Sequence, residues 1–137
     1  MTFKMDAICL LPDHIHCLFT MPEDDSNYWD RLKMIKGIFT IEYLKAGGQD
    51  GVRSHSRMNK REAAIWQRRY WEHTIQDEDD HEKHFDYIYY HPVHHKLVKD
   101  VIHRKWSSFQ RYLNEGFYPA DWGSDTCMVT DIIIPGE

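Results

Sequence analysis

The chain has 137 residues, of which 42% are hydrophobic and 14% aromatic, and a formal net charge of -5. This length and composition predict one folded domain and argue against a disordered chain. The apolar runs are too short for a membrane span, and residues 1–20 show no secretory signal. Three cysteines without CxxC spacing argue against a disulfide framework and a cysteine zinc site, so we expect a reduced, cytoplasmic location.

The first half of the chain predicts a hairpin followed by a helix. Residues 3–12 and 14–22 are mostly apolar and predict two strands, joined by a tight turn at Pro12 and Asp13. The polar stretch EDDSN then offers N-cap residues for an amphipathic helix, and Gly47-Gly48 predicts its end. Residues 47–62 are polar and predict a loop.

The second half predicts a third strand and further helices. Residues 64–75, AIWQRRYWEHTI, alternate as a strand does, and the acidic cluster 77–80 suits the start of a helix. We expect Pro92 to interrupt this helix, a second helical piece over 92–102, and a last helix over 107–116, capped by Ser107. This order predicts an α+β fold, with helices packed on one face of an antiparallel sheet.

Two histidines stand out in the second strand. Side chains at i and i+2 of a strand project from the same face, so His14 and His16 would stand side by side while Ile15 points the other way. Two imidazoles in this arrangement can converge on one cation. Surface or hydrogen-bonded histidines explain the same pattern, and spacing alone leaves both interpretations open.

A helix later in the chain offers two further candidates. Tyr87 and His91 are four residues apart and share a helix face, and His91 precedes Pro92, which predicts a position at the helix end. If this helix lies over the histidine strand, a phenol and a third imidazole approach the pair. Such a set suits metal-assisted phosphodiester cleavage with tyrosine as nucleophile. An aromatic-rich helix can also simply pack in a core, so this too stays open.

Six blocks resemble one family when they are read in order. They are LPDHIHCLF, RLKMIKGIF, IWQRRYWEHTI, DYIYYHPVHHKLV, WSSFQRY and DWG. Together they resemble the REP-associated tyrosine transposases of the HUH superfamily of single-tyrosine transposases. The resemblance covers roughly residues 3–123. It implies a ferredoxin-like antiparallel sheet and a transposase-like domain over 1–123, followed by a C-terminal tail over 124–137.

The resemblance also implies an enzyme. Tyr87 would be the nucleophile, and His14, His16 and His91 would bind a divalent metal ion, Mg²⁺ or Mn²⁺. The family usually has asparagine where this chain has His91, and histidine is itself a competent ligand. The implied reaction nicks and rejoins single-stranded DNA through a 5′-phosphotyrosine. The implied substrate is hairpin repeat DNA, the repetitive extragenic palindromes, with the protein at the bacterial nucleoid when bound to it.

Two basic segments are candidates for contact with such DNA, although the chain is acidic overall. Residues 53–69 hold six Lys or Arg against one Glu, and residues 96–105 hold four. A basic face on an acidic protein can bind phosphate, and an ordinary solvated surface fits the charge pattern equally well. The candidate DNA-binding residues are Arg53, Arg57, Lys60, Arg61, Arg68, Arg69, Lys96, Lys99, Arg104 and Lys105.

The start of the chain departs from the family pattern. Family members carry a further strand and helix before the segment that begins MTFKMDA here, so the chain looks N-terminally truncated relative to the family. Without that strand the sheet is expected to expose unpaired edges. A partner chain in a homodimer, a rearranged sheet or a truncated gene product would each account for this departure.

Three functions therefore remain open. The first is a metal-dependent transposase that nicks and joins DNA. The second is a catalytically inactive, nucleic-acid-binding remnant of the same family. The third is an unrelated metal-dependent hydrolase, in which the histidines activate water and Tyr87 has no part. The retained histidine pair and tyrosine favour the first, and the missing strand favours the second.

Overall fold

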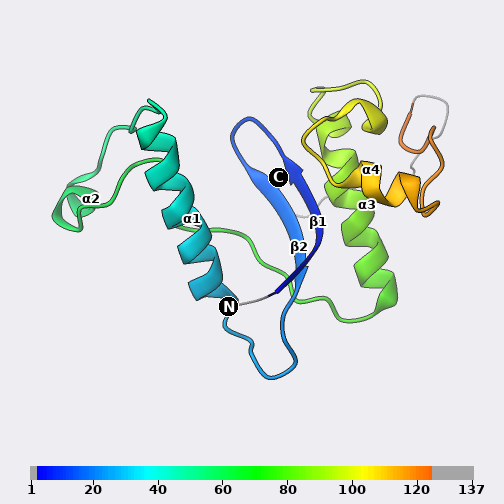
Figure 1. Ribbon diagram of the computed structural model, residues 1–137, viewed down its shortest axis with the longest axis horizontal. Helices are drawn as coiled ribbons and strands as arrows, with labels where there is room; N and C mark the ends of the chain where they lie inside the picture. The colour runs from blue at the N-terminus through cyan, green and yellow to red at the C-terminus, as the bar shows by residue number, and fades with distance from the viewer. Residues whose placement is uncertain (1–2, 125–137) are drawn as a thin grey trace. The chain divides into compact units, whose positions relative to one another are not determined.

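The computed structural model describes residues 3–124, which form two compact units (Figure 1). The hairpin unit comprises residues 3–20 and 74–124, and the helical unit comprises residues 21–73. The tail expected over 124–137 lies, apart from its first residue, outside the described residues. Among the described residues, no helix is both long and apolar enough to cross a membrane.

The predicted hairpin is confirmed. Strand β1 (Lys4–Leu10) pairs antiparallel with β2 (Ile15–Thr20), in a register that sets Cys9 opposite His16. The backbone N–H of Leu11 donates to the carbonyl of His14 at 2.9 Å and closes the turn. Because cross-strand partners project from the same face of a sheet, the side chains of Cys9 and His16 share one face.

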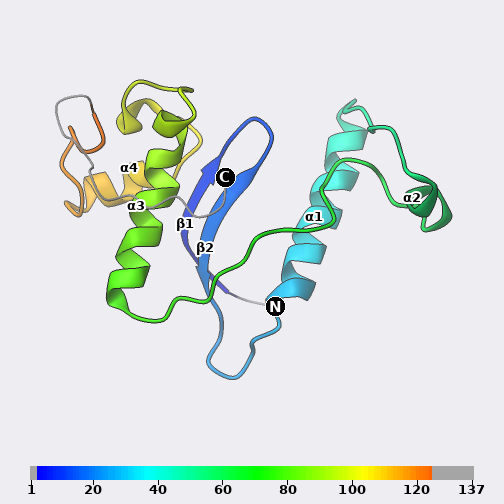
Figure 2. The ribbon, with the colours of Figure 1, turned by 180° about the vertical axis from the view of Figure 1, so that it is seen from behind.

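Helix α3 (Glu78–His94) covers that face of the hairpin, as both views of the ribbon show (Figures 1 and 2). The alternation of β1 buries Ala7 and Cys9 completely. These two residues pack with Ile88 and Tyr89 of α3, which are also buried. Val101, in the short 3-10 helix η1 (Val101–His103), and Phe109, in α4 (Phe109–Asn114), complete the core together with Leu11. The fold of the described residues is α+β with an antiparallel sheet, as predicted.

The second edge of β1 is paired by the chain itself, which differs from the exposed edge expected from the sequence. The N–H of Ser108 donates to the carbonyl of Ile8 at 2.9 Å, and the N–H of Leu10 donates to the carbonyl of Trp106 at 2.8 Å. The Ile8 N–H donates to Ser108 Oγ at 3.0 Å. The segment before α4 therefore forms an isolated bridge with residues 8–10 of β1 and satisfies the backbone groups that this part of the edge would otherwise expose.

The end of α3 differs from the prediction. The acidic start is confirmed, since the Asp77 side chain accepts the N–H of Asp80 at 2.8 Å. The expected interruption at Pro92 is wrong, because the helix continues to His94 with His91 and Pro92 buried. Burial of these two side chains offsets the hydrogen bond that proline cannot donate. The helix ends at His94, and two residues later Lys96 has a φ of 58°, a left-handed conformation usually adopted by glycine after a helix.

The segment beyond Lys96 also differs from the prediction. No second helix covers residues 92–102, and only η1 forms, over Val101–His103. The last helix is present as α4, although Ser108 rather than Ser107 occupies the N-cap position. Its end agrees with the prediction, because Gly116 follows with φ of 81°.

The helical unit contains the predicted long helix but no strand. Helix α1 (Tyr28–Lys45) begins after Asn27, whose side chain accepts the N–H of Asp30, and it ends before Gly47, where φ is 91°. The predicted loop contains a short helix, α2 (His55–Asn59). The third strand predicted over 64–75 is wrong, since these residues form no regular element. Alternation supplies only the faces of a strand, and a strand also needs a paired edge.

Candidate metal and nucleophile site

The hairpin register turns His16 toward helix α3. His16 stands opposite Cys9, which is fully buried in the core beneath α3, so its imidazole lies on the covered face. His14 lies at the end of the hairpin turn, just before β2 begins. From α3, Tyr87 and His91 present rings on one face because they are four residues apart.

These four side chains meet within the hairpin unit. The Nε2 atoms of His14 and His91 are 3.1 Å apart, and one ligand atom from each of His14, His16 and His91 lies within 4.8 Å of the others. The ring of Tyr87 packs with its centroid 5.2 Å from that of His16 and 5.0 Å from that of His91. The structure thus brings together the predicted nucleophile and all three predicted metal ligands.

The donor set fits a divalent cation. His91 is 1% exposed and His14 and His16 are half-buried, so the imidazoles converge at a partly buried position. Two nitrogens bound to one ion at about 2.1 Å and at right angles lie about 3 Å apart. The 3.1 Å between His14 Nε2 and His91 Nε2 has this spacing. One cation could therefore bind to three imidazole nitrogens, two from the hairpin and one from α3.

Asp13 orients the first of these ligands. His14 Nδ1 donates to Asp13 Oδ1 at 2.6 Å, and this hydrogen bond, with the charge of the imidazole, lowers the pKa of the Asp13 carboxyl. A carboxylate only accepts hydrogen bonds, so Nδ1 carries a proton, and it is Nε2 that presents a lone pair whenever the ring is neutral. This carboxylate–histidine arrangement is the usual support of a metal-binding imidazole.

A further histidine, which the sequence analysis missed, adjoins the site. The Nε2 of His95 is 2.8 Å from the Nε2 of His91, and its ring centroid is 5.5 Å from that of His14. The available signal was its spacing, since His91 and His95 are four residues apart and share a helix face. The expected break at Pro92 concealed that relationship, because it placed His95 in a separate second helix.

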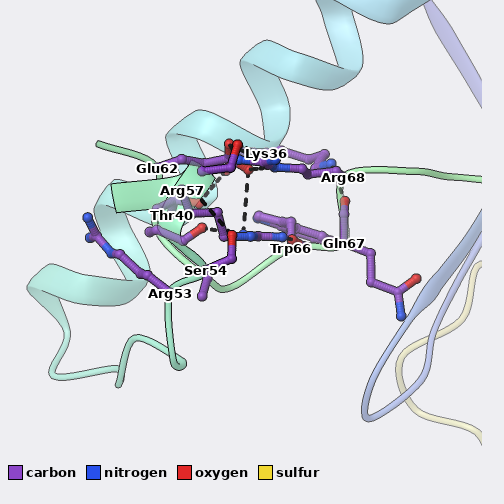
Figure 3. Close-up of polar contacts among 12 residues, drawn as sticks. Lys36, Thr40, Arg53, Ser54, Arg57, Glu62, Trp66, Gln67 and Arg68 are labelled. Carbon is purple, nitrogen blue, oxygen red and sulfur yellow. Dashed lines mark hydrogen bonds and ion pairs between the residues drawn. The ribbon is translucent and has the colours of Figure 1, made fainter. Parts of the chain in front are cut away.

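Two of the DNA-binding candidates hold the helical unit together (Figure 3). Arg57 donates to the carbonyl oxygens of Ala63 at 2.7 Å and Trp66 at 2.6 Å. Arg68 pairs with Glu62 at 2.9 Å, and this contact lowers the pKa of the Glu62 carboxyl. These contacts of the two guanidinium groups link residues within the segment 56–68. To bind a phosphate, each guanidinium would have to share its N–H donors between the phosphate and these partners.

Some of the other candidates also make contacts within the protein, and most have exposed side chains. Arg53 pairs with Asp50 at 2.7 Å, and Arg104 donates to the carbonyl of Leu10. Lys105 lies over the exposed ring of Trp106, with its Nζ 4.9 Å from the ring centroid. The candidates with exposed side chains are Lys60, Arg61, Arg68, Arg69, Lys96, Lys99 and Lys105.

Comparison with known proteins places the chain among relatives of one kind. No protein-family model matches the sequence. The chain is 46% identical over 135 residues to a Haemophilus influenzae protein named as a REP-associated tyrosine transposase. The aligned residues cover 98% of this chain and 73% of that protein. The REP-associated tyrosine transposase of Escherichia coli is 39% identical over 129 residues, which are 94% of this chain and 66% of that protein.

A solved structure agrees with these relatives. It is described as a REP-associated tyrosine transposase bound to a REP hairpin, and it matches with a TM-score of 0.72 and 35% sequence identity. The match covers 96% of this chain and 71% of the solved chain. The identity, the coverage and the fold agree, and this chain belongs to the REP-associated tyrosine transposase family.

Proposed function

We propose that this protein nicks and rejoins single-stranded DNA at hairpin repeats, with Tyr87 as the nucleophile. His14, His16 and His91 would bind the divalent metal ion, Mg²⁺ or Mn²⁺. The observation that carries the proposal is the contact of the Tyr87 ring with two imidazoles of the converging set. The solved relative bound to a REP hairpin supports the substrate class.

The chemistry follows from the residues that meet in the hairpin unit. A cation on the three imidazoles would draw charge from a non-bridging oxygen of the scissile phosphate. The Tyr87 hydroxyl would release its proton to solvent as its oxygen bonds to phosphorus, the bond to the 3′ oxygen would break, and the departing 3′ oxygen would take up a proton from solvent. The 5′-phosphotyrosine keeps the energy of the broken bond, so a free 3′-hydroxyl can reverse the step and join strands without ATP.

Exposed Lys and Arg side chains are the first candidates for contact with the phosphates of the DNA backbone. Lys60, Arg61 and Arg69 in the helical unit are exposed. Lys96, Lys99 and Lys105 in the hairpin unit are exposed as well. Trp106 is 57% exposed beneath Lys105 and offers a face on which an unpaired base can stack. With chromosomal DNA as the substrate, we expect the protein to act in the bacterial cytoplasm.

Formation of a covalent DNA–protein adduct tests the proposal. The protein is incubated with a labelled hairpin oligonucleotide and Mg²⁺ or Mn²⁺, and the products are separated under denaturing conditions. We expect an adduct with the unchanged protein, none with Tyr87→Phe, and far less with His14→Ala. Tyr90→Phe is the matched control, because Tyr90 lies on the same helix with its ring near Trp122 rather than the histidines.

The same assay separates the other two functions. Hairpin binding without an adduct in any metal would indicate a nucleic-acid-binding remnant. Strand cleavage that survives Tyr87→Phe but not His14→Ala would indicate a hydrolase in which the histidines activate water. Either outcome would overturn the proposed strand-transfer reaction.

A further inference from the structure

We propose that His95 is a fourth imidazole of the metal site, and that the resulting nitrogen-rich donor set selects a transition-metal ion such as Co²⁺ or Zn²⁺ over Mg²⁺. The inference rests on the proposed function, because it concerns the same site.

The first observation is that two ring nitrogens approach one atom. The Nε2 of His91 lies 2.8 Å from the Nε2 of His95 and 3.1 Å from the Nε2 of His14. An imidazole nitrogen has a single in-plane position, which holds either a proton or a lone pair. His91 Nε2 can therefore make one well-directed hydrogen bond but not two. A cation beside His91 Nε2 would remove this conflict, because the lone pairs of neighbouring imidazoles could then point at the ion instead of at one another.

The second observation is that both separations suit metal ligands. Nitrogens that share an ion at about 2.1 Å lie about 3 Å apart when their bonds are at right angles and about 3.4 Å apart in the tetrahedral geometry usual for Zn²⁺. The His91–His95 and His91–His14 separations, 2.8 and 3.1 Å, are near the right-angle value, so a tetrahedral ion would require the rings to move slightly apart. The ring of His95 also lies 4.3 Å from that of His91, centroid to centroid, with the planes inclined by 68°.

The helix end fixes the position of His95. Its backbone N–H donates to the carbonyl of His91 at 2.9 Å, as the last turn of α3 closes. The left-handed Lys96 then turns the chain away, and the N–H of Leu97 donates to the carbonyl of Pro92 at 2.9 Å. His95 is therefore held one turn beyond His91, on the exposed side of the site.

The composition of the set determines the preferred ion. Mg²⁺ takes oxygen ligands and retains its water, whereas imidazole is a good ligand for the later first-row metals. His14, His16, His91 and His95 offer four imidazoles. Asp13, the carboxylate beside the set, is hydrogen-bonded to His14 Nδ1. Such a site should bind Co²⁺ or Zn²⁺ far more tightly than Mg²⁺.

Metal binding to the full chain tests this proposal without measuring catalysis. Isothermal titrations with CoCl₂ and MgCl₂ are compared for the unchanged protein, His95→Gln and His94→Gln, together with the visible spectrum of bound Co²⁺. His94 is the matched control, because it is exposed on the same helix end with its ring centroid 6.0 Å from that of His91. Circular dichroism verifies that each variant is folded, and His95→Asn provides a second substitution.

We expect His95→Gln and His95→Asn to weaken Co²⁺ binding roughly tenfold and to change its spectrum, while His94→Gln does neither. Mg²⁺ binding should change by less than about twofold in every variant. Equal Co²⁺ affinity and spectra in the unchanged protein and both His95 variants would overturn the proposal, as would tighter binding of Mg²⁺ than of Co²⁺. A Tyr87-dependent adduct in those same preparations would show that the proposed function stands although the assignment of His95 fails.

Discussion

The Nε2 atoms of His14 and His91 lie 3.1 Å apart although the two residues are 77 positions apart in the chain. One imidazole comes from the end of the hairpin and the other from the last turn of α3. Only the packing of α3 on β1 and β2 brings them together, so the site exists in the folded hairpin unit and not in the unfolded chain. Metal binding at the proposed site would therefore be coupled to folding.

This coupling predicts that metal raises stability. Mn²⁺ or Co²⁺ at a hundred times its dissociation constant should add about 2.7 kcal/mol to the free energy of unfolding, and EDTA should remove the gain. Thermal unfolding monitored by circular dichroism measures the effect. His14→Ala should abolish most of it, and His103→Gln, an exposed change in η1, should leave it intact. An equal gain in His14→Ala would place the ion elsewhere.

Asp13 predicts an effect on metal affinity without loss of a ligand. In Asp13→Ala the carboxylate that fixes the His14 tautomer is gone, so Nε2 presents its lone pair for only part of the time. We expect metal affinity to fall about tenfold with little change in stability, because Asp13 is 86% exposed. Calorimetric titration measures this. Unchanged affinity would mean that the contact does not orient the imidazole.

Arg57 and Arg69 should behave oppositely in the helical unit. Arg57→Gln leaves the carbonyls of Ala63 and Trp66 without their charged donor and should cost about 2 kcal/mol of unfolding free energy. Arg69 is exposed, so Arg69→Gln should change stability by less than about 0.5 kcal/mol and weaken hairpin binding instead. Urea unfolding and fluorescence anisotropy measure the two effects. Loss of DNA affinity in a fully stable Arg57→Gln would contradict the structural role assigned to Arg57.

Asp86 predicts a pH dependence of stability. Burial raises the pKa of its carboxyl above the ordinary 3.8, despite the hydrogen bond it accepts from the Tyr118 hydroxyl at 2.8 Å. A raised folded pKa contributes stability that is fully present below the unfolded value of 3.8 and is lost as pH rises through the folded value. Asp86→Asn keeps an acceptor for Tyr118 and removes this titration.

The unfolding free energy of the two proteins should therefore diverge with pH. Relative to Asp86→Asn, the unchanged protein should lose stability as pH rises from below 3.8 through the raised pKa, and the difference should then stay constant. Urea titrations across this range measure the difference and cancel the titration of the other carboxylates. A difference that does not change with pH, or that changes in the opposite direction, would show that burial does not control this carboxyl.

The sequence predicted those elements whose boundaries are local. Pro12-Asp13 marked the hairpin turn, Asn27 and Gly47 bounded α1, and Asp77 opened α3, because caps and turns act over a few residues. Spacing alone predicted which side chains share a face, since His14 and His16 are two residues apart on a strand and Tyr87 and His91 are four apart on a helix.

The sequence failed where distant contacts decide the outcome. Residues 64–75 alternate like a strand but form no ladder, and pairing partners do not appear in a local pattern. Pro92 lies inside α3 because its burial against the core offsets the lost hydrogen bond. His95 was missed for that reason. The pairing of Ser108 with Ile8 spans 100 positions and leaves no local signature.

The most direct test of the account is the identity of the residue that DNA modifies. The adduct formed with a labelled hairpin oligonucleotide and metal is digested with protease, and the peptide that carries the nucleotide is sequenced by mass spectrometry. The account predicts a phosphodiester link to Tyr87, the 5′ end of the DNA attached, and a free 3′-hydroxyl on the other fragment. A link to any other residue, or cleavage with no linked peptide, would contradict it.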